Sequence, residues 1–234
     1  KVTLKDDSFK EYAQPMAVID IAKDISEGLA RMACVAEIDG EVKDLRTIVD
    51  KDCTLNIFTA KDPEGLAALR HTASHVMAQA IKRLWPETKL AIGPSIADGF
   101  YYDIDRDEPV TSDDLAKIEA EMKKIIKEAL PLERFELPRA QAIELMKEKN
   151  EPYKVELIED LPEDAIISFY KQGEFTDLCA GPHLMNTKEV GKAFKLMNIA
   201  GAYWRGSEKN KMLTRIYATA FAKKEDLEAY VTMM

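Results

Sequence analysis

The chain is poor in the residues that build disulfide-rich, membrane-spanning or strongly basic proteins. Its three cysteines, Cys34, Cys53 and Cys179, are odd in number and far apart, which excludes a disulfide framework and favours a reducing, cytoplasmic setting. No apolar run approaches the roughly 18 residues needed to cross a bilayer. The first residues alternate and carry charge, unlike a signal peptide. The net charge of −9 argues against a protein that captures nucleic acid by charge alone.

The composition is that of an ordinary globular protein, and 234 residues allow one large or two smaller domains. Residues 1–60 suggest strands around one helix, which we expect to begin at Pro15 and end at Gly28. Asp39-Gly40 between apolar runs predicts a hairpin. This order describes a small β-grasp, ubiquitin-like domain. It contains no histidine and no clustered acid–base pair, so binding or spacing is its expected role.

Residues 61–64 read as a linker, and residues 65–234 as a larger domain of α+β class with a histidine-bearing helix over a sheet. The apolar period predicts that this helix covers 64–85 and ends at Trp85-Pro86. Thr111 and Asp114 have the spacing of a helix capping box. Alternating apolar residues predict a strand over 153–158.

All three histidines lie in two short segments, His71-x-x-x-His75 and Cys179-x-x-x-His183. On a helix this spacing places two side chains on one face, about 5–6 Å apart. His71 and His75 fall opposite the apolar stripe of their helix, so we expect both to face a cleft. Two such pairs facing each other would form a quartet suited either to binding zinc or to moving protons during hydrolysis.

These segments resemble the editing domain of the threonyl-tRNA synthetase family, and residues 1–60 resemble the small TGS domain that precedes it. The paired segments alone are shared with alanyl-tRNA editing domains. Ala180 departs from the threonyl pattern, which typically has Arg there. The other matching motifs are Gly93-Pro94, Asp98-Gly-Phe-Tyr-Tyr-Asp103, Asp177-Leu-Cys-Ala-Gly-Pro-His183, Gly201-Ala-Tyr-Trp-Arg-Gly206 and Asn210-Lys-Met-Leu-Thr-Arg-Ile-Tyr217.

The resemblance implies hydrolysis of mischarged seryl-tRNA(Thr), with the serine-carrying acceptor end of tRNA(Thr) as substrate. His71 or Lys154 would position the attacking water, and Asp177 would orient the serine amine or hydroxyl. The remaining site residues fall into two groups by expected role. His75, Cys179 and His183 would line the pocket and move protons or hold the terminal adenosine, and Tyr102, Gly93 and Pro94 would contact the substrate.

The same resemblance bears on cofactors and partners. The quartet His71, His75, Cys179 and His183 fits zinc, but editing in the threonyl family is understood as metal-independent, so we expect no required metal. No segment resembles the ATP-binding motifs of the class II aminoacylation core. That core would follow Met234 in the full enzyme, so this chain should not activate threonine. We expect a monomer here, a homodimer for the full enzyme, and no membrane partner.

Two other hypotheses remain open at this level. The chain could be a non-catalytic tRNA-binding or regulatory module, because TGS domains also occur in regulatory proteins. It could also be a free-standing, zinc-dependent aminoacyl-tRNA deacylase.

Overall fold

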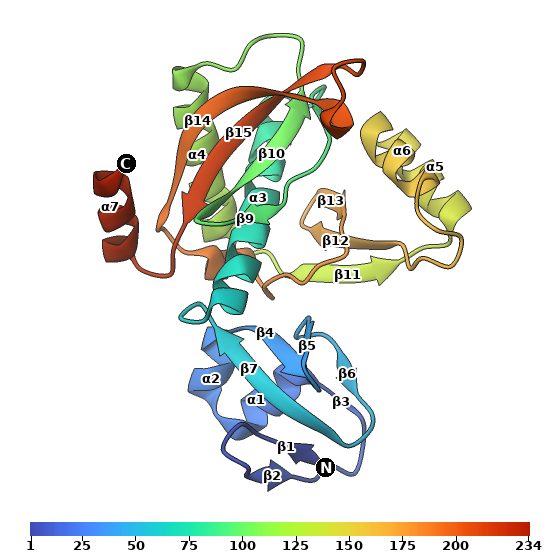
Figure 1. Ribbon diagram of the computed structural model, residues 1–234, viewed down its shortest axis with the longest axis vertical. Coiled ribbons are helices and arrows are strands. Elements are labelled where there is room, and N and C mark those ends of the chain that lie inside the picture. Colours follow the sequence, from blue (N-terminus) through green and yellow to red (C-terminus); the bar gives the residue numbers. More distant parts are fainter.

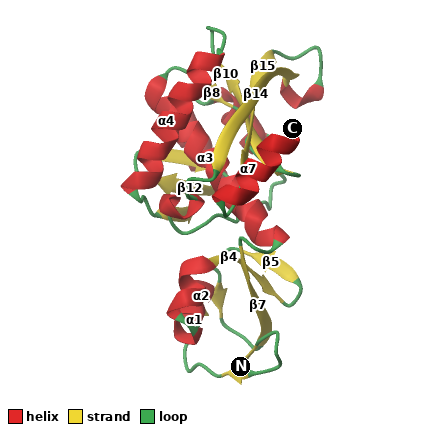
Figure 2. Cartoon of the chain, turned by 90° about the vertical axis from the view of Figure 1, so that its left-hand side faces the viewer, coloured by secondary structure: helices red, strands yellow, loops and turns green.

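The computed structural model describes residues 1–234, which form a small N-terminal unit and a larger unit above it (Figure 1). The N-terminal sheet has the order β2-β1-β7-β4-β5, in which only β1 and β7 pair in parallel. Two helices cover one face of this sheet (Figure 2). Its elements are β1 (Val2–Thr3), β2 (Phe9–Lys10), β3 (Met16–Ala17), α1 (Val18–Ile25), α2 (Glu27–Met32), β4 (Ala33–Ile38), β5 (Glu41–Lys43), β6 (Ile48–Val49) and β7 (Cys53–Thr59).

This arrangement confirms the predicted β-grasp class and the hairpin at Asp39-Gly40, but not the bounds of the helix. Pro15 does not start it, because the next two residues pair with β6 as strand β3 and α1 begins at Val18. Gly28 does not end it either. The Ser26 side chain accepts a hydrogen bond from the Leu29 amide at 3.2 Å, which caps a second helix with Gly28 inside it.

The larger unit confirms the predicted mixture of helices and sheets. One sheet has the order β14-β15-β10-β8, with β9 beside β10, and a second has the order β11-β12-β13. The strands are β8 (Lys89–Leu90), β9 (Ser95–Ile96), β10 (Gly99–Asp105), β11 (Leu132–Glu136), β12 (Ser168–Gln172), β13 (Phe175–Leu178), β14 (Phe194–Tyr203) and β15 (Met212–Ala220). The helices are α3 (Pro63–Leu84), α4 (Ser112–Glu128), α5 (Arg139–Glu148), α6 (Pro152–Glu159) and α7 (Lys224–Met233), with short 3-10 turns at η1 (Thr187–Val190) and η2 (Trp204–Gly206).

Helix α3 runs along the centre of the molecule, from the N-terminal unit up behind the β14–β15–β10 sheet (Figure 1). Pro63 occupies its first turn, Lys82 and Arg83 favour its C-terminal end, and it stops before Trp85-Pro86 as predicted. The helix therefore already includes the last two residues of the expected linker at 61–64. Helix α4 begins with the predicted capping box of Thr111 and Asp114.

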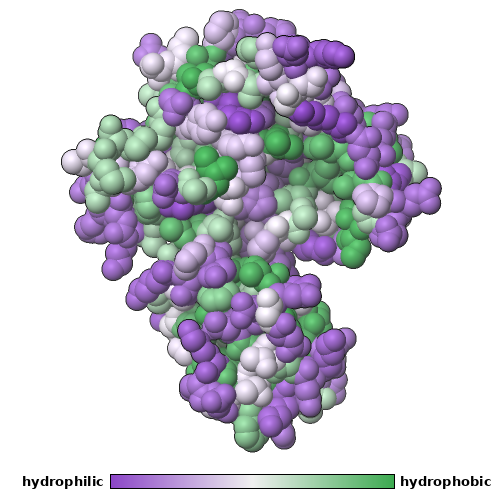
Figure 3. All heavy atoms as spheres, viewed as in Figure 1, coloured by the Kyte–Doolittle hydropathy of each residue, from purple (hydrophilic) through white to green (hydrophobic).

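The core of the larger unit extends across α3 into the N-terminal unit, which also has an eight-residue core of its own. Phe100, Tyr102 and Ile104 lie on one face of β10, are fully buried and belong to the same cluster as the buried residues of α3. Cys34 and Val35 of β4 belong to the same cluster. On the face drawn in Figure 3, apolar residues also gather where the two units meet. No helix in the chain combines the length and the apolar character of a membrane span.

The predicted strand at 153–158 is wrong, because these residues form helix α6. Tyr153, Val155 and Leu157 alternate with polar residues, which fits a strand. In so short a segment the same residues also fit a helix, and Pro152 at the first helical position favours the helix. Val155 and Ile158, three residues apart, pack into a small core with α5.

Candidate functional site

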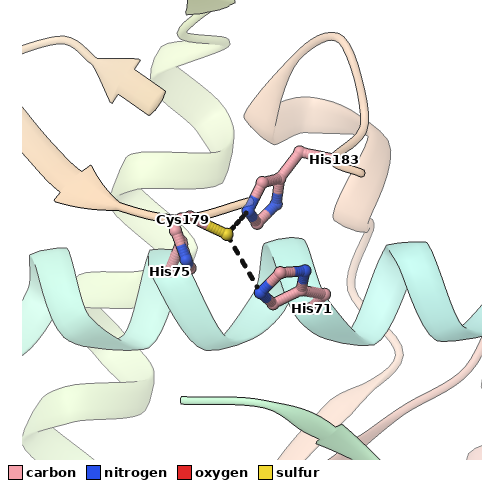
Figure 4. A group of neighbouring side chains, drawn as sticks. All are labelled: His71, His75, Cys179 and His183. Atoms are coloured by element: carbon pink, nitrogen blue, oxygen red, sulfur yellow. Dashed lines mark hydrogen bonds between the residues drawn. The ribbon is translucent and has the colours of Figure 1, made fainter. Parts of the chain in front are cut away.

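Helix α3 and the loop after β13 bring the predicted quartet together. His71 and His75 lie one turn apart on α3, and Cys179 and His183 descend on them from the loop (Figure 4). The Cys179 Sγ lies 3.3 Å from His71 Nε2 and 3.1 Å from His183 Nε2. The His183 ring lies 4.1 Å from the His71 ring and 4.2 Å from the His75 ring, between centroids.

The two histidines on α3 differ in their burial. His71 is half-buried and reaches the surface, whereas His75 is 3% exposed. The prediction that both histidines face a cleft is therefore wrong for His75. The Cys179–His183 segment and Phe175 of β13 cover its side of the helix, and the His75 and Phe175 rings lie 6.5 Å apart.

The hydroxyl group of Thr72 orients His183. Its Nδ1 lies 3.0 Å from the Thr72 Oγ1, and that oxygen also accepts the Leu184 amide at 3.0 Å. Thr72 is fully buried beside His71 on α3. A hydroxyl can donate to a neutral ring nitrogen or accept from a protonated one, so Thr72 supports either tautomer of His183. Sequence reasoning missed this residue because a threonine inside a helix carries no distinguishing signal.

A second cluster lies behind the quartet and contains the predicted Lys154, Asp177 and Tyr102. The Lys154 Nζ lies 2.9 Å from Asp177 Oδ1 and donates to the Tyr102 hydroxyl at 2.9 Å. The Tyr102 hydroxyl donates to Asp177 Oδ2 at 2.6 Å. All three side chains are at most 4% exposed. His75 connects this triangle to the quartet, because its Nε2 lies 3.5 Å from Asp177 Oδ2.

Burial and charge fix the protonation states. Burial alone would raise the pKa of Asp177, but the Lys154 ammonium, with His75 and Tyr102, outweighs it and lowers the pKa below the ordinary value. Burial lowers the pKa of His71 and of His183, and that of His75 to about 3, so the imidazoles are neutral at pH 7. Burial also raises the pKa of the Cys179 thiol to about 12. The site thus contains one ionised pair surrounded by neutral groups.

A cavity of about 420 Å³ opens beside His71. Its wall includes Pro94 from the predicted substrate-binding pair, and Gly181 and Pro182 from the quartet loop. Gly93 lies just behind, where a Cβ atom would meet the Tyr102 ring at 2.1 Å. Glycine is therefore required there by close packing. Lys154, Asp177 and Tyr102 do not line this cavity and lie deeper in the unit.

The quartet has the donor set and spacing that zinc prefers. One ligand atom from each of His71, His75, Cys179 and His183 lies within 4.8 Å of the others. A tetrahedral zinc ion, with bonds of about 2.0–2.3 Å, would draw such atoms to within roughly 3–4 Å. The buried His75 Nδ1 has no hydrogen-bond partner. These residues could hold zinc, although binding would require the Cys179 thiol to lose its proton.

Glu151, at the start of α6, is a buried carboxyl group that sequence reasoning missed. It is 6% exposed, accepts the Leu90 amide at 3.1 Å and lies 3.8 Å from the Lys82 Nζ. Burial raises its pKa to about 7 from an ordinary value of 4.5. The folded protein therefore binds this proton more tightly than the unfolded chain. The stability it contributes is present at low pH and is lost as the pH rises from 4.5 through about 7.

Glu151→Gln should remove this pH dependence, since glutamine keeps an oxygen for the Leu90 amide and has no proton to lose. We expect the variant to be more stable than the unmodified chain at pH 8, by up to roughly 3 kcal/mol, and to lose that advantage at pH 5. Urea unfolding at the two pH values measures this, with exposed Glu148→Gln as the control. Equal stability differences at both pH values would contradict the assignment.

Comparison with known proteins matches both parts of the chain to described families. Residues 1–59 match the TGS domain, and residues 167–217 match the family described as the threonyl and alanyl tRNA synthetase second additional domain. The second match contains Asp177, Cys179 and His183 but not His71, His75 or Lys154, which the fold brings to them. The chain thus contains the two kinds of module that its motifs predicted.

Relatives cover the whole chain. It is 62% identical over 232 residues to the threonine–tRNA ligase of Acetivibrio thermocellus, and 63% identical over 234 residues to that of Clostridioides difficile. That of Clostridium acetobutylicum is also 63% identical over 234 residues. The chain spans only 36–37% of the length of these relatives. It belongs to the threonyl-tRNA synthetase family, as the resemblance predicted, and corresponds to the part of such enzymes that carries a TGS domain and an editing-type domain.

Proposed function

We propose that this chain proofreads threonyl-tRNA synthesis by hydrolysing the ester of seryl-tRNA(Thr) to serine and tRNA(Thr). The observation that carries the proposal is a neutral imidazole, His71, at the wall of a cavity and backed by a buried Lys154–Asp177 ion pair. Ester hydrolysis needs a water held by a proton acceptor, a charge to orient the substrate, and a proton for the leaving ribose oxygen. Neighbouring groups here can supply each of these.

The physical need for such a site follows from the size of serine. It lacks one methyl group relative to threonine, and a hydrophobic contact of that size discriminates by only about 10–200-fold. A second, hydrolytic site can select in the opposite direction, admitting the seryl group and excluding the larger threonyl group. In this proposal the cavity beside His71 is the place that accepts the seryl group.

His71 is the stronger choice for positioning the attacking water. Its ring is neutral and reaches the cavity, so a lone pair is available to accept a proton. The Lys154 ammonium is 4% exposed and is engaged by Asp177 and Tyr102. We assign Lys154 the role of holding Asp177 ionised, so that its negative charge, behind His75, attracts the amine of a seryl group in the cavity. Tyr102 fixes the second carboxylate oxygen.

Cys179 serves as a neutral member of the pocket in this proposal. A thiol whose pKa lies near 12 contains very little thiolate at pH 7, and the thiolate is the nucleophilic form. Attack by water is therefore favoured over an acyl-cysteine intermediate. His183 and His75, both neutral, are available to move a proton toward the leaving ribose oxygen or to contact the terminal adenosine.

The partners follow from the same proposal. The substrate is the acceptor end of tRNA(Thr) carrying serine, delivered by an aminoacylation core of the same enzyme, in the cytoplasm. We propose that this region alone is monomeric and that the full enzyme is a homodimer through that core. The zinc fit of the quartet favours one alternative, a zinc-dependent deacylase. Stoichiometric zinc together with loss of hydrolysis on chelation would establish that alternative.

Release of serine from seryl-tRNA(Thr) tests the proposal, with threonyl-tRNA(Thr) as the matched substrate. We expect fast release of serine and at least tenfold slower release of threonine, because the additional methyl group of threonine must fit the same cavity. Binding of tRNA without release of either amino acid would instead favour a non-catalytic tRNA-binding or regulatory role for the TGS-containing chain.

A further inference from the structure

The loop between β5 and β6 reaches out of the N-terminal unit and contacts the quartet loop. Arg46 donates to three backbone carbonyls of the larger unit. Its Nη1 lies 3.1 Å from the His183 oxygen, its Nη2 lies 2.8 Å from the Leu184 oxygen, and both Nε and Nη2 bond the Leu132 oxygen. One guanidinium therefore holds the carbonyl groups on both sides of Leu184.

Asp44 binds His183 from the amide side. Its Oδ2 accepts the His183 amide at 3.1 Å and the Tyr170 hydroxyl at 2.6 Å. Its Oδ1 accepts the Arg46 amide and Nη1, each at 2.8 Å. The Asp44 and Arg46 side chains are 11% and 16% exposed. The two residues thus form a mostly buried ion pair that hydrogen-bonds both the amide and the carbonyl of His183.

Tyr170 extends this contact to the His183 ring. The two rings meet edge-to-face with centroids 4.5 Å apart, and Tyr170 is 1% exposed. Gly181 has a φ of +80° and lies so close that a Cβ atom would meet the Tyr170 hydroxyl at 2.1 Å. The path of the loop from Cys179 to His183 is therefore set against a tyrosine whose hydroxyl is held by the N-terminal unit.

We infer that Asp44 and Arg46 are positioning residues, by which the N-terminal unit holds His183 in place against Cys179 and His71. The inference deepens the proposed function and rests on it for its effect on hydrolysis. Charge-assisted hydrogen bonds fix geometry more strongly than neutral ones, and displacement of a reacting group by about 1 Å can reduce a rate by about 100-fold. If these residues only held the two units together, no hydrogen bond to a site residue would be needed. Asp44 accepts one from the His183 amide.

Asp44→Ala tests the inference, with Asp24→Ala as the matched control. Asp24 also accepts a tyrosine hydroxyl and a cation, from Tyr12 and Lys10, but entirely within the N-terminal unit. For Asp44→Ala we expect kcat on seryl-tRNA(Thr) to fall about 10–100-fold with KM changed less than twofold. Asp24→Ala should leave both constants unchanged. Arg46→Lys keeps the charge but not the forked geometry, so its kcat should lie between those of the other two variants.

Hydrogen exchange of the Gly181, His183 and Leu184 backbone amides gives a readout that does not depend on catalysis. We expect at least tenfold faster exchange in Asp44→Ala and no change in Asp24→Ala. Tyr170→Phe is the second variant, to be used if Asp44→Ala folds poorly. It removes one hydroxyl and keeps the packed ring, so it should shift exchange in the same direction. The inference would be overturned if Asp44→Ala and Tyr170→Phe both showed the same exchange rates and the same kcat as Asp24→Ala. An inactive unmodified chain with faster exchange in Asp44→Ala would refute only the proposed function.

Discussion

His71→Ala is expected to abolish most of the release of serine from seryl-tRNA(Thr). If His71 holds the attacking water and accepts its proton, the loss should be about 10²–10⁴-fold in kcat, the usual contribution of a positioned general base. KM should change little, because the cavity wall loses one ring and keeps Pro94, Gly181 and Pro182. Single-turnover hydrolysis with excess protein measures the chemical step directly.

Two further variants separate chemistry from packing. His71→Asn keeps a polar group of similar reach that cannot accept the proton, so it should be nearly as slow as His71→Ala. Ser95→Ala changes another residue of the same cavity without changing any base, and should retain at least half of the rate. Unfolding curves should show that all three chains fold. A rate loss below tenfold in both His71 variants would remove His71 from the mechanism.

Lys154→Met should produce the largest loss of stability of any single change in the site. It leaves Asp177 buried and ionised with only the Tyr102 hydroxyl and His75 beside it. Removing one partner of a buried pair costs about 3–5 kcal/mol, because the other charge stays in a poorly solvated place. Urea unfolding at pH 7 measures the change. Hydrolysis should fall as well, because the carboxylate would take up a proton more readily.

The double variant Lys154→Met/Asp177→Asn provides the internal check. It removes both charges, so we expect it to recover at least half of the stability that Lys154→Met loses, although hydrolysis should stay low. Lys43→Met breaks an exposed pair with Glu41 and should cost less than about 1 kcal/mol. If Lys154→Met were no more costly than Lys43→Met, the buried pair would not have the energetic role assigned here.

Local sequence signals predicted much of the fold and the two residue pairs of the quartet. The apolar period of α3, the Thr111 capping box and the Asp39-Gly40 hairpin depend on neighbouring residues, so they can be read directly. The spacing of His71 and His75 and of Cys179 and His183 predicted two pairs. The resemblance then predicted that these pairs meet. The structure brings their ligand atoms to within 4.8 Å.

The remaining features depend on contacts between distant segments. Lys154 reads as part of an alternating strand, whereas its segment forms helix α6, which packs on α5 and places the ammonium against the distant Asp177 and Tyr102. Glu151 carries no motif, and its raised pKa comes mainly from burial by distant parts of the chain, with a further contribution from the Asp177 charge. Asp44 and Arg46 lie more than 130 residues from His183, and no periodicity links them to it.

The core shared through α3 has a consequence for how the two family modules can be separated. Cys34 and Val35 of the TGS module are buried against the same cluster as Ala68 and Leu69 of the helix. Separating the two units would expose apolar surface on both, at a cost of about 25 cal/mol for each Å². The N-terminal unit also has an eight-residue core of its own, so the module boundary near residue 59 lies between two cores that share a common apolar contact. Neither module can be exchanged without keeping the apolar surface that it presents to the other.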